Sequence, residues 1–110
     1  MKEEMLSYLD ERIAWHKGEQ SRLKVEYRQD EANLMQIAIN VYGIFRSIYQ
    51  AVHFDLDETV KRFANIVHTW DESHRLACTH SDDQKRLIEE IKITRATEIL
   101  RRAKETEGKA

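Results

Sequence analysis

The stretch from Leu34 to Val52 constrains the fold most, because it can bury a broad apolar surface. Between Ala32 and Phe54 the only Lys, Arg, Asp or Glu is Arg46. At 100° per residue, the apolar side chains cover one face that is wider than the seam of a two-stranded coiled coil. A helix with such a face needs more than one neighbour. Because polar residues interrupt the run, the stretch predicts the central helix of a bundle and not a membrane span.

The opposite face of this stretch is polar, but its side chains are small and uncharged. Asn40, Gly43 and Ser47 lie on it, together with Gln36. A face in contact with water usually carries Lys and Glu. Small residues instead allow another backbone to come close. Two interpretations remain open, namely a contact with a second subunit and a weakly patterned wet face.

The composition favours an all-α protein with a single domain, residues 1–110. There is no proline and there are only three glycines, so residues that end helices are scarce. The chain is 41% hydrophobic and 35% charged, which is too apolar for general disorder and too polar for a membrane protein.

Charge and cysteine content bound the partners and the location. The net charge of -2 gives no general attraction to nucleic acids or acidic membranes, so neither is expected as a partner. The single cysteine, Cys78, excludes an internal disulfide and suits a reducing compartment. The first residues lack the apolar segment of a signal peptide. We therefore expect a cytoplasmic protein.

One heptad register can be followed from Met5 to Val52 without a shift, which favours one long, coiled-coil-like helix. At 1.5 Å per residue such a helix would span roughly 75 Å. Gly18 is the plausible break, because glycine often follows the last residue of a helix. The register continues across Gly18, however, and we favour a continuous helix over this alternative.

Two shorter helices are expected to follow. Asp55 and Glu58 form a capping-box pattern before a helix that runs to about Thr79. A second such pattern begins at Ser81, before a helix that runs to about Lys104, and the residues after it are expected to fray. The predicted fold is an antiparallel helical bundle of one long N-terminal helix, possibly broken near Gly18, and two shorter helices.

The helix lengths lead to a prediction of self-association. Two shorter helices would cover only the C-terminal half of the long one, which leaves the apolar seam before Tyr27 without a partner. A homodimer is the simplest arrangement that covers it. A break at Gly18 would instead permit a monomeric four-helix bundle. The predicted oligomer interface comprises Leu6, Leu9, Ile13, Trp15, His16, Leu23, Tyr27, Asn40, Gly43 and Ser47.

His74 and Cys78 are the only candidates for a metal site, and the favoured interpretation is a core histidine. An imidazole and a thiol at positions i and i+4 of a helix can share a metal, but no further ligand follows at a regular spacing. A buried histidine can also fix the register of a bundle, as a buried asparagine does. No catalytic residue, metal or cofactor is predicted.

The sequence thus predicts a small helical interaction or assembly protein, an adaptor or regulator, that acts by self-association of an amphipathic helix. Another protein could also serve as the partner. The alternative is an oligomeric all-α enzyme or metal-binding protein with a site near His74. A basic stripe on the last helix is a weaker hint of an acidic partner or of nucleic-acid binding; it comprises Lys92, Arg95, Arg101, Arg102 and Lys104.

Overall fold

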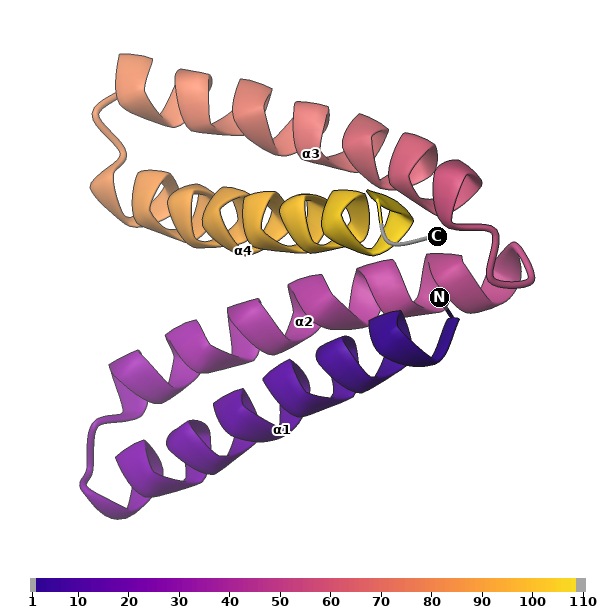
Figure 1. Cartoon of the computed structure of the whole chain (residues 1–110). Helices are drawn as coiled ribbons and strands as arrows, with labels where there is room; N and C mark the ends of the chain where they lie inside the picture. The colour runs from indigo at the N-terminus through magenta and orange to yellow at the C-terminus, as the bar shows by residue number, and fades with distance from the viewer. Residues whose placement is uncertain (1, 109–110) are drawn as a thin grey trace.

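The computed structural model describes residues 2–108, which form four helices and no strand (Figure 1). The all-α prediction is confirmed. Helix α1 spans Lys2–Val25, α2 spans Gln29–Ala51, α3 spans Leu56–Thr79 and α4 spans Asp83–Gly108. None of these four helices is both long enough and apolar enough to cross a membrane.

The helices form two antiparallel hairpins arranged as a V (Figure 1). Helices α1 and α2 make one hairpin, and α3 and α4 make the other. The hairpins converge near the α2–α3 turn, where α1 begins and α4 ends, and they diverge toward the α1–α2 and α3–α4 turns. The molecule is flat, with extents of 42 × 36 × 22 Å.

The predicted long N-terminal helix is wrong, because the chain turns back at residues 26–28 and not at Gly18. Tyr27 has a left-handed backbone, with φ of 60°. The amide of Arg28 donates to the carbonyl of Leu23 at 2.8 Å, and that of Tyr27 donates to Lys24 at 3.1 Å. These two bonds define a Schellman motif, which ends a helix and usually places glycine at the left-handed position.

The other two turns close in the same way and also lack glycine. His53 and Ser81 occupy the left-handed position, each with φ of 55°. The amide of Phe54 then donates to the carbonyl of Tyr49 at 2.8 Å, and that of Asp82 donates to Ala77 at 2.9 Å. In all three turns within residues 2–108, the helix therefore ends without the glycine that usually occupies the left-handed position.

The start of α3 follows the sequence prediction, whereas α4 starts one residue later and ends later than expected. The Asp55 carboxylate accepts a hydrogen bond from the amide of Glu58 at 3.1 Å. Asp82, and not Ser81, caps α4 by accepting from the amide of Lys85 at 3.1 Å. Helix α4 continues past Lys104, and its Thr106 is buried. Lys109 and Ala110, also expected to fray, lie outside the described residues.

Helix α2 lies at the centre of the core, as its broad apolar face predicts. Tyr42, Phe45 and Tyr49 are fully buried on it. The Phe45 ring meets that of Phe63 of α3 edge-on, with ring centroids 5.1 Å apart. Helix α4 contributes small or aliphatic side chains to the same core, which lets α2 and α4 approach each other closely. The core residues from α4 are Ala96, Ile99 and Ala103.

Replacing Tyr27 with glycine should stabilise the protein. The Tyr27 side chain is 97% exposed, so its removal loses no packing, while glycine relieves the left-handed strain. We expect Tyr27→Gly to raise the free energy of unfolding by about 0.5–1 kcal/mol in urea titrations. Tyr27→Ala keeps the Cβ atom and should change it little. A decrease of about 1 kcal/mol in the free energy of unfolding of Tyr27→Gly would instead indicate that residue 27 lies inside a helix.

Candidate functional site

The residues of the predicted oligomer interface separate into two groups in the structure. Because α1 folds back on α2, Leu9, His16 and Leu23 are buried within the chain. Leu6 and Ile13 are half-buried against the core. These five residues therefore have partners within the chain and do not form a free apolar seam.

The remaining predicted interface residues reach the surface at three places. Trp15 is 52% exposed on α1, and Tyr27 projects from the α1–α2 turn. Asn40 and Ser47 are exposed on α2, and Gly43 is half-buried between them. The structure thus brings the small polar residues of α2 together and leaves Trp15 and Tyr27 apart from them.

The small residues of α2 belong to a shallow apolar depression of about 620 Å³. Five isoleucines, contributed by α1, α2 and α3, line it, and Lys17 is the only charged residue among its lining residues within the described chain. A β-carbon added at Gly43 would meet nothing within 4 Å, so this position is open to the outside. We call this surface the isoleucine face. Its lining residues are Ile13, Lys17, Ile39, Asn40, Gly43, Ile44, Ser47, Ile48 and Ile66.

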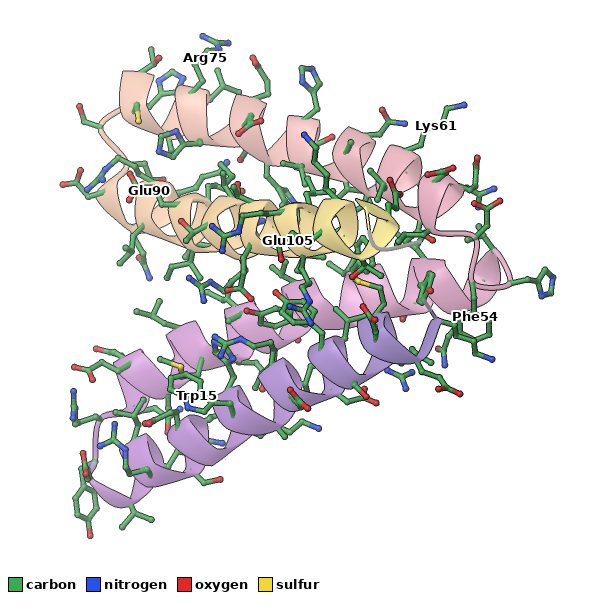
Figure 2. All side chains as sticks on the ribbon, viewed as in Figure 1. Trp15, Phe54, Lys61, Arg75, Glu90 and Glu105 are labelled. Atoms are coloured by element: carbon green, nitrogen blue, oxygen red, sulfur yellow. The ribbon has the colours of Figure 1, made fainter. Side chains whose placement is uncertain are left out.

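A second feature is a groove of about 510 Å³ between the two hairpins, lined by α1, α2 and α4. Figure 2 shows Trp15 of α1 and Glu90 of α4, on the two hairpins that border it. Its walls are mainly apolar, with Leu34 and Met35 on α2 and Leu87 on α4. The polar side chains Arg12, His16 and Arg95 line it as well. We call this feature the hairpin groove.

A polar cluster around Glu98 ties the two hairpins together beside this groove. Tyr8 of α1 and Tyr42 of α2 both donate hydrogen bonds to Glu98 Oε2, the second at 2.8 Å. Arg12 Nε lies 3.4 Å from the same oxygen, and Arg95 donates to Glu98 Oε1 at 3.0 Å. One carboxylate of α4 therefore accepts hydrogen bonds from two other helices.

The environment of this cluster shifts the pKa values of its members. Burial acts to raise the pKa of Glu98, but the hydrogen bonds from Tyr8 and Tyr42 and the charges of Arg95 and Arg12 outweigh it. The pKa of Glu98 is therefore below its ordinary value. Burial, together with the bond to Glu98, raises the pKa of Tyr8. The cluster thus holds an ionised carboxylate, two neutral phenols and two guanidinium groups.

His16 lies beside the cluster in a defined tautomer. Its Nδ1 is 2.7 Å from the backbone oxygen of Arg12, which can only accept, so Nδ1 carries the proton. Burial lowers the pKa of His16, and the charges of Arg12 and Arg95 act in the same direction. The ring is therefore neutral near pH 7, and its Nε2, on the far side from Nδ1, is a hydrogen-bond acceptor.

His74 contacts the Glu90 carboxylate, but Arg86 already binds that group. His74 Nε2 is 3.1 Å from Glu90 Oε1, and Arg86 binds the same oxygen at 2.9 Å. Cys78 is exposed, and its sulfur is 3.9 Å from His74 Nε2. Within residues 2–108 no group of three or more His, Cys, Asp or Glu residues could hold a metal ion.

The basic stripe of α4 is largely engaged with acids of the same helix. Lys92 Nζ is 3.0 Å from Glu89, and Arg95 binds Glu98. Arg102 lies 4.0 Å from Glu105. These pairs reduce the positive potential that the stripe would offer to an acidic partner.

Sequence reasoning missed the Glu98 cluster. Tyr8 and Arg12 are one turn apart on α1, and Arg95 and Glu98 are three residues apart on α4, which are spacings that also occur on solvated helix faces. The local pattern contains no signal that Glu98 meets Tyr42, because that contact depends on how α4 packs on α2.

Replacing Glu98 with glutamine should weaken the joint between the hairpins. The substitution removes the charge that accepts bonds from Tyr8, Tyr42 and Arg95 while keeping the side-chain shape. We expect the free energy of unfolding to fall by about 2 kcal/mol in urea titrations. Glu105→Gln, on an exposed part of α4, should change it by less than about 0.5 kcal/mol. Equal effects of both substitutions would contradict this role for Glu98.

Stability should also depend on pH through His16. Its folded pKa is lowered, so between about pH 6.5 and that value the unfolded chain binds a proton that the folded chain does not. The free energy of unfolding should therefore decrease as the pH falls from 6.5 to 5. Urea titrations across this range should give a smaller slope for His16→Gln. If the free energy of unfolding of His16→Gln depends on pH as steeply as that of the wild-type protein, the pH dependence arises from a different group.

Comparisons with known proteins do not identify a relative of this chain. No family model matches the chain, and no curated protein or solved structure matches it either. The isoleucine face and the hairpin groove are therefore the candidate functional surfaces that the chain itself presents.

Proposed function

We propose that this protein is a small helical assembly protein that forms a homodimer through the isoleucine face. The observation that supports the proposal is the depression at Gly43, in which isoleucines of three helices surround small polar residues of α2. Surfaces of monomeric proteins seldom combine several aliphatic side chains with so little charge.

The chemistry of this face favours a second copy of the chain as the occupant. An isologous contact places the same surface on both subunits, so its charges must tolerate their own copies. At the isoleucine face the only charged lining residue, within the described chain, is Lys17. The nearby Arg46 is already neutralised by Asp10, with 2.8 Å between Nε and Oδ1. With one lysine as the only charge that lines this face on each subunit, repulsion between like charges is small when two such faces pair.

The geometry of the molecule also supports this face as an interface. Asn40, Gly43 and Ser47 lack bulky side chains, so a partner helix can approach α2 closely. Stable dimers bury roughly 800 Å² on each partner. The broad side of the flat molecule measures 42 × 36 Å, which is large enough for such a contact.

A matched pair of glycine substitutions tests the proposal. Gly43→Glu places a charge at the centre of the isoleucine face, whereas Gly18→Glu makes the same change on α1 outside it. In both cases the added β-carbon meets nothing within 4 Å, so both chains should fold.

Light scattering after size-exclusion chromatography at micromolar concentration measures the outcome. We expect a dimer for the wild-type protein and for Gly18→Glu, and a monomer for Gly43→Glu. Circular dichroism should give the same helical signal for all three. A monomeric wild-type protein would refute the proposal, and a dimer that survives Gly43→Glu would place the interface elsewhere.

A further inference from the structure

The hairpin groove is a second surface that dimerisation through the isoleucine face does not use. It is lined by residues of α1 and α2 from one hairpin and of α4 from the other. Its volume of about 510 Å³ falls within the range of roughly 300–1,000 Å³ typical of small-molecule sites. Apolar walls with a few converging polar groups are also typical of such sites.

The basic residues of this groove lie at one end, and the largest aliphatic side chains lie toward the other. Helix α1 runs away from the point where the hairpins converge, whereas α2 and α4 run toward it (Figure 1). Arg12 and Arg95 therefore lie nearer the closed inner end, and Leu34 and Leu87 lie nearer the open mouth. Leu87 is 43% exposed there, so part of this apolar wall faces solvent. Glu90 also lines the groove near Leu87, where Arg86 donates to its carboxylate at 2.9 Å and offsets its charge. A ligand that matched this order would place an anion inside and an apolar chain toward the mouth.

The charge at the inner end favours an anion. Arg12 and Arg95 both contact Glu98, so two guanidinium groups face one carboxylate and a net positive charge remains. Arg12 uses Nε for Glu98 and Tyr42, and Arg95 uses one terminal nitrogen for Glu98. Each guanidinium has five N–H donors, so donors remain for a further acceptor.

Aromatic and imidazole groups complete the inner part of the groove. The Trp15 ring lies 5.3 Å from the Arg12 guanidinium carbon and 4.9 Å from the His16 ring. Arg12 is thereby held beside an apolar surface, where ionic contacts are less weakened by water than in bulk solvent. His16 is buried and lines the groove beside Trp15.

From this arrangement we infer that the hairpin groove binds an amphipathic organic acid, with its carboxylate on Arg12 and Arg95 and its apolar chain along Leu34, Met35 and Leu87. The class is defined by the two features that the groove combines, an anion site at a closed end and an aliphatic wall that leads outward. The proposal is independent of the dimer, because the groove residues are distinct from those of the isoleucine face.

Isothermal titration with decanoate tests this proposal. We expect saturable binding of one decanoate per chain and a change in tryptophan emission that is lost in Trp15→Phe. Acetate, which has the carboxylate alone, and decyltrimethylammonium, which has the same chain with a cationic head, should bind at least roughly tenfold more weakly. Equal binding of decanoate and decyltrimethylammonium would refute the anion site.

Substitutions on two sides of α4 locate the contact. Arg95→Gln should weaken decanoate binding roughly tenfold, because it removes a charged hydrogen-bond donor. Arg101→Gln, on the same helix outside the groove, is the matched control and should keep the wild-type affinity. Leu87→Ser changes an exposed side chain, so it should fold normally while weakening the contact with the decanoate chain.

Two outcomes would overturn the inference. One is the absence of saturable decanoate binding to the folded wild-type protein. The other is a wild-type affinity in both Arg95→Gln and Leu87→Ser. Gly43→Glu separates this site from the proposed dimer, because that variant should bind decanoate like the wild-type protein even when it is a monomer.

Discussion

The structure depends on burying the aromatic face of α2. Tyr42, Phe45 and Tyr49 are fully buried, and no single neighbouring helix could cover so wide an arc. Helices α1, α3 and α4 must all pack on α2, which requires the chain to reverse direction three times. Tight turns make these reversals. The positions of the hairpin groove and the isoleucine face follow from how α1, α3 and α4 pack on α2.

The secondary structure could be predicted from the sequence except for the first turn. In α3 the buried residues Leu56, Phe63, Trp70 and Ala77 recur at the helical spacing, so periodicity alone places them on one face. The turn at Tyr27 was missed because the heptad register continues across it and because no glycine is present. Between Glu26 and Glu31, Tyr27 is the only aromatic or aliphatic residue, and this interruption of the apolar face was the available signal.

The candidate sites were predictable only in part. The small residues at Asn40, Gly43 and Ser47 share one face of one helix, so periodicity alone brings them together. Ile66 joins them from α3, and Glu98 reaches Tyr42 from α4, through packing between distant segments. Charged residues at positions i and i+3 of a helix have the same spacing whether they are solvated or contact another helix. The sequence alone therefore did not single out Arg95 and Glu98.

The division into two hairpins has a consequence for how the molecule opens. Helices that are neighbours in the sequence are also neighbours in space, and such local topologies are associated with fast folding. The hairpins converge near the α2–α3 turn (Figure 1), and the Glu98 cluster links α4 to α1 and α2. One core of buried residues from all four helices also spans both hairpins. Opening the molecule between the hairpins would expose part of that core, so the two hairpins should unfold together and not one at a time.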